Sequence, residues 1–161
     1  MNPKILILGY TSSGKSLAAE ILAQALDADY LNTSDQLIIE LAESIGVSTI
    51  HILENKDMYR MRLFKFGRAK QEQNPLWPQD IQITKADILT GLRSPDEVTA
   101  ARKHNLYDKI IWIDREGYGA GATDKLTPEH ADVVIKNDEG IEDLRAKLLL
   151  LLDQLRLELS K

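Results

Sequence analysis

The chain has 161 residues, of which 43% are hydrophobic and 28% are charged, and its net charge is −5. This length suits one α/β domain, and the excess of acidic residues argues against a surface that coats polymeric nucleic acid. The absence of cysteine excludes disulfides and thiolate metal sites, so we expect a cytoplasmic protein. The longest apolar run, residues 148–152, is too short to cross a membrane.

The first stretch of the chain carries its most specific motif. Residues 9–16 have the sequence GYTSSGKS, which matches the phosphate-binding loop (P-loop) pattern G-x-x-x-x-G-K-[ST]. An apolar run over 4–8 predicts a buried strand before the loop, and the apolar spacing over 17–26 predicts a helix after it. The motif requires this strand–loop–helix context, so we expect the chain to bind a nucleoside triphosphate.

The residue types of this loop suit phosphate binding. Backbone N–H groups of a glycine-containing loop and the positive end of the following helix can surround an anion. We expect Lys15 to reach the β- and γ-phosphates of ATP or dATP, and the Ser16 hydroxyl to hold Mg²⁺. The predicted nucleotide-binding residues are those of the loop and the residue after it: Gly9, Thr11, Ser12, Ser13, Gly14, Lys15, Ser16 and Leu17.

The chain then alternates between short strands and helices. Residues 28–32 predict a second strand, and residues 33–35 supply capping residues for a helix over 36–44. The pattern is helical again over 49–72, and two prolines mark a loop over 74–78.

The second half of the chain continues the alternation. A strand over 87–90 precedes Ser94, Pro95 and Glu97, which suit the N-cap, first and third positions of a helix that ends near residue 104. The remaining predicted segments are strands over 109–114 and 131–135, a loop over 115–129 and a terminal amphipathic helix over 140–159.

Five strands that alternate with helices predict an α/β fold with three layers, in which helices cover both faces of a five-stranded parallel sheet. Such sheets bind their ligands at the carboxyl ends of the strands. The segments that follow strands are therefore the candidate site: 9–16, 32–35, 91–93, Arg115 and 136–137.

Two short patterns suggest a GTPase, but their order excludes one. Residues 84–87 match [NT]-K-x-D and residues 114–117 match D-x-x-G. A GTPase has these segments in the reverse order, and no circular permutation restores it. In addition, residues 84–87 lie before the predicted strand over 87–90, whereas the [NT]-K-x-D signature of a GTPase should follow a strand. An ATPase in which Asp114 ends the magnesium-binding strand is a second hypothesis, but we interpret this residue as a polar strand end.

The arginines favour a third hypothesis, a small-molecule kinase. An enzyme that transfers a phosphoryl group between two anionic substrates must neutralise both phosphates, and Arg offers a bidentate geometry that Lys lacks. Arg93 is the strongest candidate because it directly follows a predicted buried strand, beside Gly91. Arg60 and Arg68 are more simply interpreted as surface charges. The arginines in or near segments outside the sheet are Arg60, Arg62, Arg68, Arg93 and Arg115.

Several segments resemble phage-type deoxynucleoside monophosphate kinases. Residues 88–97 (ILTGLRSPDE) look like their (D)-x-R-x-P-x-E segment. Residues 131–137 (ADVVIKN), followed by Gly140, are similar to their late A-D-x-x-I-x-N strand, which dephospho-coenzyme A kinases share. Residues 32–35 fall where such kinases begin the acceptor-side helix, and residues 62–77 resemble their helical lobe with its downstream Trp. The resemblance covers most of the chain.

The resemblance implies transfer of the ATP γ-phosphoryl group to a deoxynucleoside monophosphate, with Mg²⁺ bridging the donor phosphates. It also implies a single P-loop kinase domain over residues 1–161, with an acceptor lobe over about 36–80 and a lid over about 115–129. The implied catalytic residues are Lys15, Arg93 and Arg115. The implied acceptor-binding residues are Asp35, Arg62, Arg68, Trp77 and Arg93, and Asn137 would approach the donor base.

One departure concerns the position two residues before Arg93. The family has Asp there, whereas this chain has Gly91. We take Asp35 as the candidate replacement near the metal and Asp87 as a weaker one. The acceptor base would stack on Trp77, Tyr59 or Phe66 and hydrogen-bond to Asp35, Gln36 or Gln71.

Two alternatives stay open. The first is a dephospho-coenzyme A kinase or another small-molecule P-loop kinase, and the second is a regulatory protein that binds nucleotides without catalysis. The expected partners are nucleotides, without polymeric nucleic acid or a membrane. The Leu-rich helix over 140–159 is a candidate homodimer face, although core packing is its simpler use.

Overall fold

A five-stranded parallel sheet forms the centre of the computed structural model, which describes residues 1–119 and 125–161. The strands lie in the order β2-β3-β1-β4-β5, and all four pairings are parallel, as predicted. The central strand β1 and the interior of β4 are apolar because both faces of the sheet are covered. The strands are β1 (Ile5–Leu8), β2 (Tyr30–Asn32), β3 (Ile88–Thr90), β4 (Lys109–Asp114) and β5 (Val133–Lys136).

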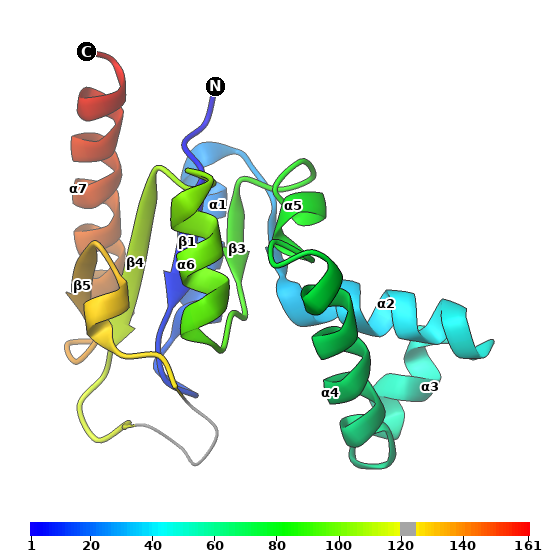
Figure 1. The fold of residues 1–161 in the computed structure, drawn as a ribbon. Helices are drawn as coiled ribbons and strands as arrows, with labels where there is room; N and C mark the ends of the chain where they lie inside the picture. Colours follow the sequence, from blue (N-terminus) through cyan, green and yellow to red (C-terminus); the bar gives the residue numbers. More distant parts are fainter. Residues whose placement is uncertain (120–124) are drawn as a thin grey trace.

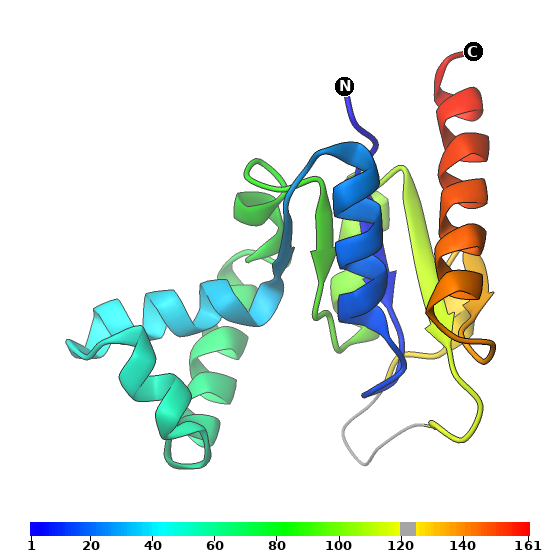
Figure 2. The ribbon, with the colours of Figure 1, turned by 180° about the vertical axis from the view of Figure 1, so that it is seen from behind.

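Helices cover the two faces of the sheet. Helices α1 (Lys15–Leu26) and α7 (Ile141–Leu159) lie on one face, and α6 (Pro95–Lys103) lies on the other (Figures 1 and 2). The side chains of β1 alternate between these layers, since successive residues of a strand point to opposite faces. Ile5 and Ile7 pack in the cluster under α1 and α7, whereas Leu6 and Leu8 pack in the cluster under α6.

The terminal helix α7 belongs to the core. Its leucines Leu144, Leu148, Leu152 and Leu155 are buried in the cluster that also contains residues of α1. The spacing of these leucines places them on one face of the helix. Core packing, the simpler of the two predicted uses of this helix, is therefore confirmed. Within the described residues, no helix is long and apolar enough to cross a membrane.

A helical lobe projects beyond the β2 edge of the sheet (Figure 1). It has its own apolar cluster, which includes Ile38, Leu41, Ala42, Ile52 and Tyr59. The predicted helical stretch over 49–72 divides at Asn55, which is the C-cap of one helix and the N-cap of the next. The lobe consists of α2 (Thr33–Ile45), α3 (Thr49–Glu54) and α4 (Lys56–Gln73).

Two details of the lobe differ from the sequence prediction. Asn32 is the N-cap of α2, because its side chain accepts a hydrogen bond from the Ser34 N–H, and the predicted caps 33–35 lie inside the helix. The short helix α5 (Gln79–Gln82) occupies a segment predicted to lead into a strand. It packs through Gln79 and Gln82, two buried polar residues that an apolar pattern cannot reveal.

The remaining elements match closely. Ser94, Pro95 and Glu97 form the predicted start of α6, including a complete capping box. A single 3-10 turn (Pro128–His130) precedes β5. Both termini lie at the end of the molecule opposite the carboxyl ends of the strands (Figure 1).

Candidate active site

The P-loop lies between the end of β1 and the start of α1, in the strand–loop–helix context that its sequence predicts. Gly14 has a φ of 108°, in the left-handed region that glycine favours, and a Cβ there would overlap the Asn137 side-chain nitrogen. Ser13 is 1% exposed, and its hydroxyl has no hydrogen-bond partner in the structure. A glycine that allows no side chain and a buried polar atom without a partner both fit a loop that binds an anion.

Lys15 lies over the beginning of this loop. Its ammonium donates hydrogen bonds to the carbonyl oxygens of Gly9 and Tyr10, at 2.6 and 3.0 Å. Thr11, Ser12 and Ser16 are exposed. Their side chains are therefore accessible to a ligand bound at the loop and the first turn of α1. Leu17 packs against the apolar cluster under α1, so its side chain is structural.

Asn137 joins the end of β5 to the P-loop. Its side-chain amide donates to the Ser13 carbonyl at 2.8 Å, and its backbone N–H donates to the Asp114 carbonyl at 2.7 Å. The Asn137 side chain was predicted to approach the donor base, but its amide N–H₂ group already donates a hydrogen bond to the P-loop. In this structure Asn137 fixes the loop conformation.

Arg93 lies in the loop between β3 and α6, and its side chain is exposed. Because β3 pairs directly with β1, this loop and the P-loop leave the same edge of the sheet from neighbouring strands. The backbone N–H of Arg93 donates to the Glu97 carboxylate at 3.0 Å. The backbone that carries this arginine is thus held by the capping box of α6.

The structure gives a physical reason for Gly91. Its φ is 98°, and an added Cβ would overlap Asn32 Oδ1 and lie 2.8 Å from Thr33 Oγ1. The Asn32 carboxamide fills the space that a side chain at position 91 would need. Aspartate cannot occupy this position without displacing the N-cap of α2. Asn32 could have been recognised from the sequence as the N-cap of α2, because asparagine is a strong N-cap residue and here it ends a predicted strand.

The predicted acceptor-side residues occupy different places on the lobe surface. Asp35 is exposed in the first turn of α2. Arg62 is exposed, with its guanidinium 6.0 Å from the Tyr59 ring centroid, and Arg68 lies 3.8 Å from Glu72 in the same helix. The two guanidinium groups are thus exposed on the lobe surface, where an anionic ligand can reach them.

The predicted lid, over about 115–129, includes residues 120–124, which lie outside the described residues. Arg115 follows β4 and is exposed, with its guanidinium 5.0 Å from the Tyr118 ring centroid. Lys125 is also exposed. Both cations remain accessible at the carboxyl end of the sheet.

Trp77 corrects one prediction. The residue is 4% exposed, its indole N–H donates to Glu40 at 2.8 Å, and its ring meets Phe66 edge-on at 6.3 Å. Tyr59 is also buried, in the cluster of the lobe. A base can stack only on an exposed ring face, so neither ring is available for stacking in this conformation. Both were predicted from residue type, which does not show burial.

The two aspartates that matched the GTPase patterns, Asp87 and Asp114, each form an ion pair with a lysine. Asp87 pairs with Lys4 at 2.6 Å, at the amino end of β3 and thus away from the P-loop edge. Asp114 forms an ion pair with Lys136. The position of Asp87 at the amino end of β3 agrees with the exclusion of a GTPase, because a guanine-binding residue would have to lie near the P-loop. Among the described residues, no group of three His, Asp or Glu side chains is arranged to hold a metal ion.

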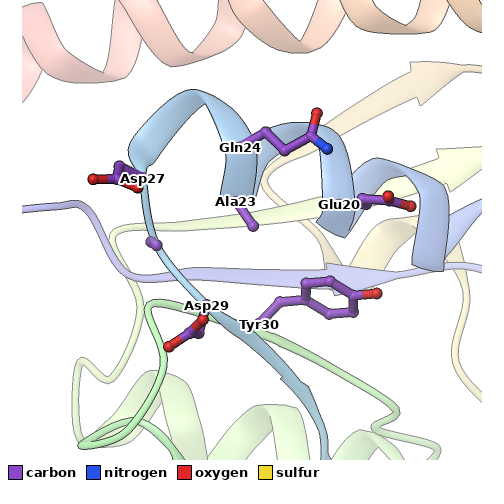
Figure 3. A pocket seen from close by; sticks show the side chains of 7 residues that line it. Glu20, Ala23, Gln24, Asp27, Asp29 and Tyr30 are labelled. Atoms are coloured by element: carbon purple, nitrogen blue, oxygen red, sulfur yellow. The ribbon is translucent and has the colours of Figure 1, made fainter.

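A cavity of about 330 Å³ lies away from this site (Figure 3). It is lined by Glu20, Ala23 and Gln24 of α1, by the loop 27–29 and by Tyr30, the first residue of β2, whereas the P-loop precedes the first turn of α1. Its carboxylates, Glu20, Asp27 and Asp29, would repel a phosphate. We therefore do not place the nucleotide there.

No protein-family model and no curated protein matches the chain. Solved structures do. APS kinase CysC from Mycobacterium tuberculosis, in complex with AMPPNP and APS, is 17% identical, with a TM-score of 0.55 over 94% of this chain and 98% of that one. Shikimate kinase from Aquifex aeolicus vf5 is 16% identical, with a TM-score of 0.53 over 93% and 96%. TT1252 from Thermus thermophilus is 16% identical, with a TM-score of 0.52 over 96% and 98%.

The chain has the fold of P-loop kinases. This likeness is one of fold, and it extends over nearly the whole chain, the helical lobe included.

Proposed function

We propose that the chain is an ATP-dependent kinase that phosphorylates nucleoside monophosphates, and deoxynucleotides in particular. The observation that carries the proposal is the pairing of β1 with β3, which places the P-loop and the Arg93 loop on neighbouring strands at one edge of the sheet. An anion-binding loop next to an exposed guanidinium suits a reaction between two phosphates.

The residues that end β2 and β3 suit an acceptor that is already anionic. Asn32, Thr90 and Gly91 cannot act as a general base at neutral pH. The nearest carboxylate after these strands is Asp35, which is exposed in the first turn of α2 and which we propose to act near the metal. An alcohol acceptor would have to lose a proton during transfer, whereas a phosphate oxygen needs no base. Nucleoside monophosphates satisfy this condition, and the resemblance to deoxynucleoside monophosphate kinases selects them among phosphate acceptors.

The residues of the site divide between the two substrates. Lys15 and the loop N–H groups would hold the β- and γ-phosphates of ATP, and Arg93 with Arg62 would hold the acceptor phosphate. Ser16 would hold Mg²⁺, which supplies charge neutralisation at the donor phosphates when it is bound. Arg115 would add positive charge at the edge of the site and help to exclude water.

An ADP-release assay across the four deoxynucleoside monophosphates and the four ribonucleotides tests this proposal. We expect turnover with one or more deoxynucleotides and a lower kcat/KM for the matching ribonucleotide. Dephospho-coenzyme A belongs in the same panel, since residues 131–137 are similar to a strand of its kinases as well. An absence of turnover with every nucleoside monophosphate would contradict the proposed activity.

Arg93→Ala separates an enzyme from a regulatory nucleotide-binding protein. In an enzyme this variant loses turnover while its affinity for ATP stays unchanged. A protein that binds ATP equally well with and without Arg93, and that shows no transfer in either form, would be the regulatory alternative.

A further inference from the structure

The Glu97 carboxylate uses its two oxygens on two different parts of the molecule. Oε1 accepts hydrogen bonds from the backbone N–H groups of Arg93 and Ser94, both at 3.0 Å, and from the Ser94 hydroxyl at 3.1 Å. Oε2 accepts a hydrogen bond at 3.0 Å from the side-chain amide of Gln71, which lies in α4. One side chain thus connects the Arg93 loop to the helical lobe.

Neighbouring polar groups strengthen this junction. Gln71 also donates to the Trp77 carbonyl at 3.2 Å, and the buried Gln79 donates to the Glu97 carbonyl at 3.1 Å. The Tyr107 hydroxyl donates to Gln79 Oε1 at 2.7 Å. Burial, and to a lesser degree the Glu97 carboxylate, raise the pKa of Tyr107, so this hydroxyl keeps its proton. Satisfied polar networks of this kind hold their members in one arrangement.

A helix cap alone does not require these contacts. The capping box needs only the oxygen that accepts from the N-cap backbone N–H of Ser94, which is Oε1. The contact between Oε2 and Gln71 crosses to a helix that also carries Arg62 and Arg68. Hydrogen bonds to a charged carboxylate are stronger than those between neutral groups, so this contact can set the position of one segment relative to the other.

We propose that Glu97 is a positioning residue, which fixes the Arg93 loop relative to the helical lobe so that both contribute to one acceptor site. The inference rests on the proposed function, because it assumes that Arg93 and the lobe bind the same acceptor. Glu97 acts through Arg93 and Gln71 and does not itself contact the substrate.

A double-mutant cycle on Glu97 and Gln71 tests this inference. Glu97→Gln keeps an oxygen for the backbone of residues 93 and 94, but it turns an N–H₂ group toward the Gln71 amide. Gln71 can accept from this group only by rotating its amide and giving up its hydrogen bond to the Trp77 carbonyl, so the link is weakened. Gln71→Ala removes the same link from the other side. Asp96→Asn is the matched control, because it removes one negative charge from the same helical turn.

The expected result is a change in acceptor binding alone. Glu97→Gln and Gln71→Ala should each raise the KM for the acceptor by about tenfold, with the KM for ATP within twofold of the wild type. The double variant should be no worse than either single one, since the two residues act as a pair. The inference is overturned if Glu97→Gln behaves like Asp96→Asn, if both KM values rise together, or if the two effects multiply.

Amide hydrogen exchange of the same proteins gives a readout that needs no activity. We expect faster exchange over 71–82 and 91–94 in Glu97→Gln and Gln71→Ala, and wild-type exchange in Asp96→Asn. A wild type without turnover on any acceptor would refute the proposed function, and exchange would still decide whether Glu97 couples the two segments. Unchanged exchange in all variants would overturn the inference.

Discussion

The donor side and the acceptor side of the site are built in different ways. The P-loop depends on backbone geometry, and distant segments hold it in place, as the hydrogen bond from Asn137 to the Ser13 carbonyl shows. The lobe has its own apolar cluster and meets the Arg93 loop through side chains such as Glu97 and Gln71. A short sequence motif is enough to predict a ligand site that is made of backbone groups. A site made of surface side chains from two segments depends on how the fold places those segments relative to each other.

The largest effect is expected on the donor side. Lys15→Ala should lower kcat/KM by roughly a hundredfold to a thousandfold, because in the proposed function it removes the cation that would hold the β- and γ-phosphates of the donor. Lys85→Ala is the control, since Lys85 is exposed in the 84–87 pattern that the structure places away from the P-loop. Steady-state kinetics measure both. Lys15→Ala activity within fivefold of the wild type would show that the P-loop does not hold the donor.

The next effect concerns the acceptor side. Arg93→Ala should lower kcat/KM for the acceptor by about a hundredfold, and Arg93→Lys should recover only part of it, since Lys lacks the bidentate geometry. The Kd for ATP should not change. Arg60→Ala should match the wild type, because Arg60 is exposed and paired with Asp57. An equal loss in Arg60→Ala and Arg93→Ala would mean that general surface charge, and not Arg93, attracts the acceptor.

Gly91 separates backbone strain from steric overlap. Gly91→Ala and Gly117→Ala both place a side chain at a positive φ, 98° and 85°, but only the Gly91 Cβ meets other atoms. We expect Gly117→Ala to lower the free energy of unfolding by about 1 kcal/mol, and Gly91→Ala by roughly 1–3 kcal/mol more. Urea denaturation measures the difference. Equal losses would show that Asn32 does not restrict position 91.

Trp77→Phe tests whether the tryptophan is part of the lobe core. The variant loses the 2.8 Å hydrogen bond to Glu40, so we expect a loss of about 1–3 kcal/mol in stability. The KM for the acceptor should stay within twofold, because the buried ring does not face a ligand. A fivefold or larger rise in that KM at unchanged stability would support base stacking by Trp77.

The smallest effect is a pH dependence of the lobe. Burial acts to raise the pKa of Glu40, but hydrogen bonds from Gln36, Lys70 and Trp77 and the charge of Lys70 outweigh it and lower the pKa below its ordinary value of 4.5. A carboxyl whose pKa is lowered by folding stabilises the protein above its unfolded pKa, and this stability is lost as the pH falls through the folded pKa. Melting temperatures should therefore fall below about pH 4.5. Glu40→Gln should show a shallower fall, and identical profiles would contradict the assignment.

The sequence predicted the fold and the place of the P-loop within it well. All five strands, the P-loop and the capping box at Ser94 and Glu97 follow from local patterns, and the structure has each of them. Local signals suffice because apolar strand patterns, the glycines of a loop motif and capping residues can each be recognised within a few residues.

The acceptor side could not be predicted to the same extent. Trp77 was expected in a binding role, yet it is buried, because burial depends on how the segment before α5 packs against α2 and α4 and not on residue type. Similarly, the reason for Gly91 is Asn32, which is distant in sequence and adjacent in the sheet. The contact between Glu97 and Gln71 has no sequence signature, since it joins two elements whose relative position only the fold determines.

Transfer of a radioactive label tests the central claim most directly. The protein is incubated with [γ-³²P]ATP, Mg²⁺ and each deoxynucleoside monophosphate, and the products are separated by chromatography. The proposed function predicts that the label appears as the β-phosphate of a deoxynucleoside diphosphate, and that Arg93→Ala lowers this product strongly. Label that appears only as inorganic phosphate, or that remains in ATP with every acceptor, would contradict it.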